Sequence, residues 1–304
     1  MKLNRLNSIM AKSVATIAAC AALNATAGTA PAPKNPTPVE PAPTALFDSI
    51  GATLDVAYDT RYYFRGLWFA DNIVTAALNV SIPLTDKLTW GVGAAYISTI
   101  ETPALDVTGT KNRNGFDYSE FDLITSLSYD MGWGKLGAQY QYYGYPDTYS
   151  GSFNGVSNAV NDSELGITGA SELGLTLTIP VGAANVYMGY YYDLRINGSY
   201  FQLAADYTIA LTDWMSLVPS IQTGYGIDYY TGTRGAVFAG VSPGTTQSSG
   251  FTHTLFSVAA PIKLTKSATL TPYAAWNFAW QTRNYMNATA DNEVFGGVKL
   301  SIAF

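Results

Sequence analysis

The chain has 304 residues, enough for one large domain or two ordinary ones. Charged residues make up 12% and hydrophobic residues 48%, yet no long apolar run follows residue 30, which argues against membrane-spanning helices. The single Cys, Cys20, and the net charge of −6 argue against a disulfide framework, a thiolate metal site and nucleic acid as a partner.

The N-terminus predicts a signal peptide over residues 1–27. Residues 1–12 carry three positive charges, residues 13–23 form a short apolar run, and Ala25-Thr26-Ala27 has the A-x-A arrangement of a cleavage site. Cleavage after Ala27 would leave 13 basic and 22 acidic side chains and a net charge of −9. The alternative is a lipoprotein signal, because Ile17-Ala18-Ala19 precedes Cys20.

Residues 28–45 form a separate segment that is rich in Pro and Ala. Such a composition cannot build a packed core and favours an extended chain. We predict a periplasmic linker over 28–45 and a barrel domain over 46–304.

From residue 51 onward, apolar and polar residues alternate with a period of two. In the first run, Leu54, Val56 and Tyr58 alternate with Asp55 and Asp59. Eleven further apolar faces begin at Val74, Leu88, Phe121, Leu136, Leu173, Val186, Phe201, Leu217, Phe256, Leu270 and Val294. Runs of about 9–11 residues are typical of strands that cross a bilayer, where an open sheet edge would leave backbone groups unpaired. The sequence predicts an all-β fold, a transmembrane antiparallel up-and-down β-barrel of about 12 strands, with ten or fourteen strands as alternatives.

The connections between these runs alternate in length. Short ones, predicted as periplasmic turns, occupy 83–87, 130–134, 180–184, 212–213 and 265–267, and long ones, predicted as extracellular loops, occupy 101–118, 146–163 and 230–250. Aromatic residues should form a band at each membrane interface. The predicted periplasmic band holds Trp90, Tyr129, Trp133, Trp214 and Phe304, and the outer band holds Tyr62, Phe64, Tyr142, Tyr190, Tyr192, Tyr225, Phe278 and Trp280.

The C-terminal run alternates strictly through Val298, Leu300 and Ile302 and ends on Phe304. It resembles the recognition strand that the barrel-assembly machinery of the outer membrane reads. The expected location is therefore the outer membrane of a Gram-negative cell. The expected partners are outer-membrane lipid and that machinery, with the oligomeric state open.

The stretch 55–72, DVAYDTRYYFRGLWFADN, resembles the opening strand of the TorF-type porins. The matching positions are an aspartate, aromatics, an Arg-Gly pair and a following Asp-Asn, which here are Asp59, Tyr63, Phe64, Arg65, Gly66, Asp71 and Asn72. The resemblance covers about twenty residues, and it implies a channel-like barrel without naming a solute.

The inward faces of the predicted strands carry more acids than bases. A barrel of twelve strands lies between the filled eight-stranded kind and the porins with a wide channel, which leaves room for a small pore. The predicted pore-lining residues are Asp55, Asp59, Arg61, Arg65, Glu120, Asp122, Glu172, Asp206, Asp228, Arg283, Glu293 and Lys299. Rings of carboxylates favour cations, so weak cation selectivity is expected. Arg61 and Arg65 should pair with Asp55, Asp59 or Glu293, either as structural salt bridges or as a charge ladder at a constriction.

The leading functional hypothesis is an outer-membrane channel for passive diffusion of small hydrophilic solutes or ions, with no catalytic residues, cofactor or metal. The second is a structural or surface-binding barrel with a plugged lumen. The third is an outer-membrane hydrolase that uses His253, the single His, for which no nucleophile motif is found nearby. In the predicted register, His253 lies at the outer rim and points inward.

Overall fold

The computed structural model describes residues 51–100, 119–144, 169–195, 197–229, 249–280 and 292–304. The signal peptide, its cleavage site, the Pro-rich linker and most of the three long connections lie outside this part of the chain and stay predictions. Within the described residues, no helix is long and apolar enough to cross a membrane.

The described chain consists of β-strands. They are β1 (Gly51–Phe64), β2 (Leu67–Pro83), β3 (Leu88–Thr99), β4 (Ser119–Asp130), β5 (Lys135–Gly144), β6 (Gly169–Val181), β7 (Ala184–Asp193), β8 (Gly198–Tyr207), β9 (Ile209–Ala210), β10 (Ser216–Ile227), β11 (Ser249–Ala259), β12 (Ile262–Lys263), β13 (Ala268–Ala279) and β14 (Glu293–Ala303).

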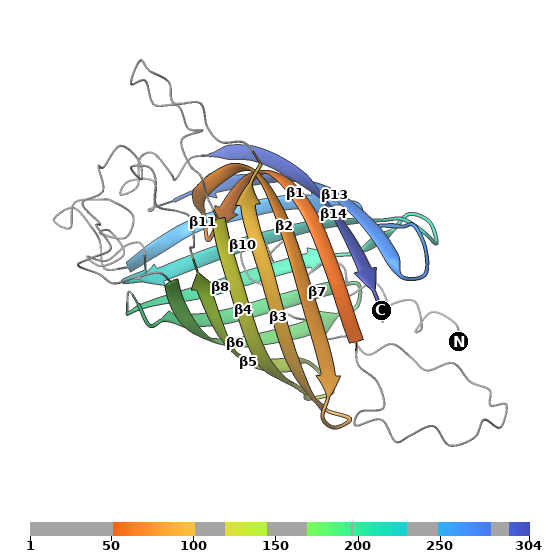
Figure 1. The fold of residues 1–304 in the computed structure, drawn as a ribbon, viewed down its shortest axis with the longest axis horizontal. Coiled ribbons are helices and arrows are strands. Elements are labelled where there is room, and N and C mark those ends of the chain that lie inside the picture. Colours follow the sequence, from red (N-terminus) through yellow and green to blue (C-terminus); the bar gives the residue numbers. More distant parts are fainter. Residues whose placement is uncertain (1–50, 101–118, 145–168, 196, 230–248, 281–291) are drawn as a thin grey trace, which may run out of the picture.

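The strands close into a barrel of twelve strands, as the sequence predicted (Figure 1). Each strand pairs antiparallel with its neighbours in chain order, and β1 pairs with β14 from Thr53↔Ala303 to Asp59↔Gly297. The two-residue strands β9 and β12 continue β8 and β11 after short breaks, so they add no position to the wall. The described wall is thus closed, which is the condition for a sheet in lipid.

The two faces of the wall differ as the period of two requires. On β6, which pairs with β5 and β7, Leu173 and Leu175 are 49% and 54% exposed, whereas Glu172 is 1% exposed. The same outward apolar face recurs around the barrel, with Leu78, Leu123, Leu127, Met188, Leu203, Ile221 and Val258 all exposed. A continuous apolar outer surface of this kind is stable in lipid. The described wall therefore has the outward face of a transmembrane barrel, and the outer membrane stays its predicted location.

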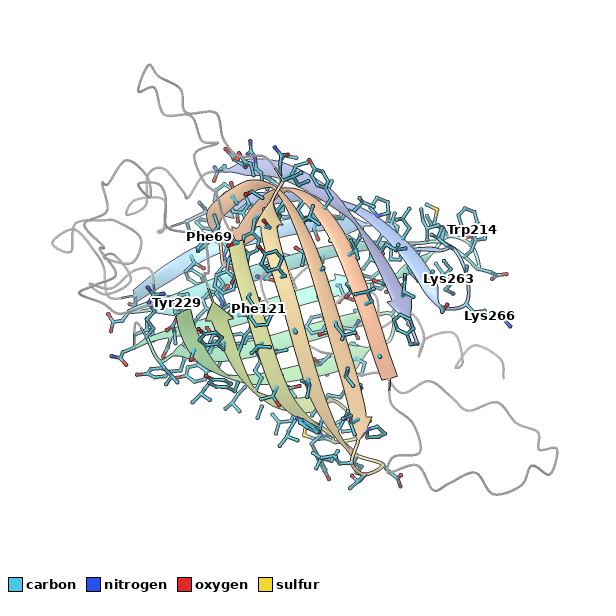
Figure 2. All side chains as sticks on the ribbon, in the orientation of Figure 1. Phe69, Phe121, Trp214, Tyr229, Lys263 and Lys266 are labelled. Carbon is cyan, nitrogen blue, oxygen red and sulfur yellow. The ribbon has the colours of Figure 1, made fainter. Side chains whose placement is uncertain are left out.

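We call the turns at 83–87, 130–134, 180–184, 212–213 and 265–267 the inner turns, and threonine side chains stabilise three of them. The hydroxyl oxygen of Thr85 accepts hydrogen bonds from the backbone N–H groups of Lys87 and Leu88 at 3.2 and 2.9 Å. Thr212 and Thr265 accept equivalent bonds from the residues two and three positions later. Threonine favours such turns because its hydroxyl competes with the strand ladder for backbone groups. This end of the barrel carries the predicted periplasmic aromatics, among them Trp214, which lies with Lys263 and Lys266 opposite to the end of Phe69 and Tyr229 (Figure 2).

A charge placed on the outward face should weaken folding into lipid. Leu175 lies at the middle of β6, so Leu175→Arg is expected to destabilise the folded barrel by about 2–4 kcal/mol. The measurement is the free energy of unfolding in lipid vesicles. The matched control is Thr176→Arg, whose side chain lines the interior cavity and stays in water. Equal effects of both substitutions would contradict the assigned orientation of the wall.

Candidate functional site: the lumen hairpin

The outer ends of β1 and β2 leave the wall together. Pairing of β1 with β14 ends at Asp59, and pairing of β2 with β3 ends at Ile73, followed by one hydrogen bond from Ile100 N–H to Asn72 O at 2.9 Å. Residues 60–72 are thus a two-stranded extension that pairs with no other described strand, which we call the lumen hairpin. It curls over at the outer end of the barrel (Figure 1).

The tip of the lumen hairpin is a two-residue turn. Arg65 and Gly66 have φ of 51° and 87°, and Phe64 pairs with Leu67 across them, as in a type I′ turn. An Arg in this left-handed region costs about 1–2 kcal/mol, so other contacts must hold it there. The apolar face predicted to begin at Val74 points outward, since Val74 and Leu78 are exposed, but β2 itself begins earlier, at Leu67.

The lumen hairpin is buried on both of its faces. Tyr62, Phe64 and Phe69 are 2%, 8% and 6% exposed, and Phe64 and Phe69 pack edge to face with ring centroids 6.2 Å apart. Tyr62 and Phe64 were predicted to face lipid in the outer aromatic band, which is wrong. The alternation places a side chain relative to its own hairpin, and this hairpin has turned into the barrel, where protein lies on both sides.

Arg65 reaches across the lumen to the opposite wall. Its Nη1 and Nη2 donate to the two carboxylate oxygens of Glu172 on β6 at 2.5 and 2.6 Å, and Nη1 also donates to the hydroxyl of Tyr229. The guanidinium carbon lies 4.5 Å from the ring centroid of Tyr191 on β7, 4.4 Å from that of Tyr200 on β8 and 5.0 Å from that of Tyr229. We call Arg65, Glu172, Tyr191, Tyr200 and Tyr229 the Arg65 clasp. A desolvated bidentate pair inside aromatic rings is among the stronger contacts a single cation can make.

Glycines on the wall make room for the clasp. A Cβ at Gly189 would lie 2.6 Å from the ring of Tyr191, and one at Gly224 would lie 2.5 Å from the ring of Tyr200. Because these positions lack side chains, the ring of Tyr191 lies against the backbone of its own strand, β7, and the ring of Tyr200 lies against that of the neighbouring strand, β10. The rings also contact each other in series, with centroids 6.2 Å apart for Tyr191 and Tyr200 and 5.4 Å apart for Tyr200 and Tyr229.

His253 lies beneath the tip of the lumen hairpin. Its ring is within 3.0 Å of the Thr252 hydroxyl and 3.4 Å of the Gln222 amide nitrogen, and it is 1% exposed. A Cβ on Gly66 would lie 2.5 Å from the Cβ of His253. His253 therefore points inward as predicted, but it belongs to the packed interior and not to the exposed rim. Ser248, which lies near it in the sequence, is outside the described residues.

The base of the lumen hairpin is tied to the adjacent wall. Arg61 forms the predicted salt bridge with Glu293 and a second with Asp71 at 3.6 Å. The hydroxyl of Tyr63 donates to Glu293 at 3.2 Å, and that of Tyr62 donates to Glu120 at 3.0 Å. Arg65, by contrast, does not pair with Asp55, Asp59 or Glu293 as expected but with Glu172, because the hairpin carries it across the lumen.

A cavity of about 90 Å³ lies in the inner part of the barrel and reaches the clasp. Apolar residues such as Leu177, Met188 and Ala204 line it together with hydroxyl and amide side chains, one base and one acid; these polar residues include Ser126, Ser128, Lys135, Gln139, Thr176, Thr178, Asp206, Ser220, Gln222 and Ser257. Asp206 accepts a hydrogen bond from Asn185 at 2.9 Å. Tyr191 lines the same cavity, so the aromatic wall of the clasp forms part of its boundary.

The remaining predicted pore residues divide into four groups. Asp59 and Asp122 are 1% and 4% exposed, and Tyr273 donates to Asp59. Asp55 and Lys299 lie on the inward faces of β1 and β14, where they neighbour Ser301 and Ala57. Asp228 departs from the prediction: β10 ends at Ile227, and Asp228 is exposed with a φ of 52°, so it does not continue the inward face. Arg283 lies outside the described residues.

The aromatic part of the site was not predicted from the sequence. Tyr190 and Tyr192 were placed toward lipid, which leaves Tyr191 inward, yet no role was assigned to that position. Tyr200 and the glycines Gly189 and Gly224 likewise alternate inward on neighbouring strands. The sequence signal that could have identified these residues is the presence of large aromatic residues and glycines together on the inward faces of neighbouring strands.

No family model and no curated protein matches the sequence. The resemblance to the TorF-type porins thus stays a prediction. Among solved structures, the chain is similar to the COG4313 outer membrane channel from Pseudomonas putida F1, with 13% identity, 88% of this chain and 100% of that chain covered and a TM-score of 0.48. It is also similar to the translocator domain of the autotransporter NalP from Neisseria meningitidis (8% identity, 84% and 88% covered, TM-score 0.43) and to LpxR from Salmonella typhimurium (8%, 84% and 99%, 0.44). These likenesses assign no activity or solute, so any function rests on the residues of the lumen.

Proposed function

We propose that the protein is an outer-membrane channel for small hydrophilic solutes or ions, whose outer lumen the Arg65 clasp closes in the conformation described above. The cavity of about 90 Å³ inside the barrel supports this proposal most directly. A barrel built only for structure gains stability from a fully packed interior, whereas this cavity has Ser, Thr and Gln side chains in its lining that can hydrogen-bond water and solutes.

The charges of the lumen support weak cation selectivity. Arg61 and Arg65 are engaged by carboxylates, so they add little net positive charge. The other inward carboxylates of the described residues, Asp55, Asp59, Glu120, Asp122 and Asp206, then exceed the inward lysines Lys135 and Lys299. An excess of fixed negative charge in a narrow space concentrates cations.

Planar-bilayer recording of the refolded protein tests the channel. Current steps are expected from the wild type, with larger or more frequent ones when the lumen hairpin is shortened by replacing residues 60–72 with a two-residue turn. The alternative, a plugged structural or surface-binding barrel, is favoured by one observation, the bidentate Arg65–Glu172 pair across the lumen. Absence of current from both proteins would establish that alternative over the channel.

Selectivity is tested by the reversal potential across a KCl gradient. The wild type should favour K⁺, and Asp206→Asn should lower the cation-to-anion permeability ratio by about twofold, because it removes a fixed charge from the cavity wall. Asp213→Asn, at an exposed inner turn, is the matched control and should leave the ratio nearly unchanged. A reversal potential of anion sign would refute the selectivity while leaving the channel itself intact.

A hydrolase centred on His253 gains no support from the geometry. The ring contacts Thr252 and Gln222 and is covered by the hairpin tip, which blocks the approach of a lipid or other substrate. Unchanged lipid turnover by His253→Ala is the expected result.

A further inference from the structure

The wall side of the Arg65 clasp is a complete receptor for a planar cation. Glu172, Tyr191, Tyr200 and Tyr229 all come from outside the lumen hairpin: the first three lie on β6, β7 and β8, and the fourth follows β10. We call these four residues the cation receptor. Together they offer two carboxylate oxygens in one plane, one hydroxyl acceptor and three aromatic faces within 5.0 Å of the bound carbon atom.

We propose that the cation receptor binds small organic cations that carry a guanidinium or alkylammonium group, and that Arg65 is its tethered occupant. A solute of this class would compete with Arg65, release the lumen hairpin and favour the open lumen. The link to transport rests on the proposed channel function, whereas binding to the receptor does not.

The receptor should keep its shape when the hairpin leaves. β6, β7, β8 and β10 pair with one another in unbroken registers, from Gly169↔Gly144 around to Ile227↔Ser199, so their backbones do not depend on residues 60–72. The Tyr143 hydroxyl lies 3.5 Å from Glu172 and the tyrosine rings pack in series, which restricts the side chains without Arg65. A preorganised site loses little entropy on binding.

The lumen hairpin, in contrast, is easier to displace than the strands of the wall. Its backbone ladder is internal, and Arg65 and Asn72, which lie at its tip and its base, both have positive φ, at 51° and 52°. Strained residues of this kind persist only while surrounding contacts hold them. Filling the receptor with another cation removes the Arg65 contacts and leaves the tip held only by weaker ones, such as Phe64 against Tyr143 and the 3.4 Å hydrogen bond from Asn277 to the Gly66 oxygen.

A solute can reach the receptor from the inner side. The cavity that begins near the inner turns, at Lys135 and Thr178, extends to Tyr191 of the receptor. The charged residues of its lining, Lys135 and Asp206, offset each other, so a cation is not repelled along this route and is attracted at Glu172. Glu172 repels anions, and a neutral solute gains neither charge–charge attraction at Glu172 nor a cation–π contact with the rings, so the receptor discriminates by charge as well as by shape.

The test uses the full-length barrel with Arg65→Ala, which empties the receptor, and guanidinium and urea as probes. The two molecules share size, planarity and hydrogen-bond donors but differ in charge. In Arg65→Ala, ¹⁵N-guanidinium should show saturable line broadening in NMR spectra and urea should show none. Adding Glu172→Gln should weaken guanidinium binding at least tenfold, while adding Asp213→Asn, an exposed turn carboxylate, should not. Folding of each variant is checked by the heat-dependent mobility of the barrel on gels.

A second measurement uses the wild type, so it does not depend on the variant. Guanidinium at millimolar concentration should speed tryptic cleavage after Arg61 or Arg65 severalfold, because displacement exposes the hairpin, whereas urea at the same concentration should not.

Equal broadening or equal cleavage with both probes would overturn the receptor. If Arg65→Ala binds guanidinium but no form of the protein conducts, the receptor stands and the channel function falls. Conduction without guanidinium-specific binding would instead support the channel and refute the receptor.

Discussion

Arg65→Ala is expected to open the outer lumen and raise single-channel open probability more than any other single substitution. The change removes the bidentate pair and leaves Glu172, which is 1% exposed, without its counter-charge. Breaking a buried pair in this way costs about 3–5 kcal/mol, which shifts the ratio of closed to open states by a factor on the order of 10² to 5 × 10³. The measurement is the conductance and open probability of the refolded protein in planar bilayers.

Two variants serve as references for this result. Arg65→Lys keeps the charge but cannot donate two parallel hydrogen bonds to Glu172, so it should be intermediate. Lys263→Ala, at the inner turn where its Nζ donates to the backbone oxygen of Asp213, should behave as the wild type. An Arg65→Ala channel with wild-type open probability would show that the clasp does not close the lumen.

Gly66→Ala is expected to displace the hairpin tip without touching a charge. The added Cβ would lie 2.5 Å from the Cβ and 2.6 Å from the Cγ of His253, and the φ of 87° is strained for any residue with a side chain. Overpacking costs about 1–3 kcal/mol and positive φ about 1 kcal/mol more, so tip exposure should rise on the order of tenfold to several hundredfold. The measurement is the rate of tryptic cleavage after Arg61 and Arg65, both of which lie in the hairpin.

The companion variant separates the two causes of that effect. His253→Gly added to Gly66→Ala removes the clash, including the contact with the Cβ of residue 253, but not the strain at φ, so cleavage should fall back most of the way toward the wild-type rate. His253→Gly alone leaves a void beneath the tip and should have a smaller effect than Gly66→Ala. No rescue by His253→Gly would mean that the close approach of Gly66 to His253 does not hold the hairpin.

The wall of the barrel was predictable because the alternation of apolar and polar residues within each strand shows which face points outward. The alternation of Leu173 and Leu175 with Glu172 depends only on lipid outside and water or protein inside. The same logic correctly turned Glu120, Asp122 and Asp206 inward. It failed for Asp228, because the rule holds only while the strand continues and β10 had already ended.

The position of Arg65 could not be predicted in this way. Its alternation with Phe64 is as regular as that of any wall residue, and nothing within the first strand shows that pairing with β14 stops at Asp59. The carboxylate that pairs with Arg65 is set by the strand order of the closed barrel, which brings β6, β7 and β8 opposite β1. A long-range contact of this kind is set by the geometry of the closed wall and not by local pattern.

The sequence by itself was enough to predict a membrane-spanning barrel, its number of strands and the inward direction of most wall carboxylates. The reason is that lipid imposes a period of two and a closed ladder on every strand that crosses it. Only the tertiary structure decided that residues 60–72 leave the wall and that Arg65 joins Glu172, Tyr191, Tyr200 and Tyr229 across the lumen. The reason is physical: a buried cation takes the position where its carboxylate, hydroxyl and aromatic partners converge, and that position exists only once the barrel has closed.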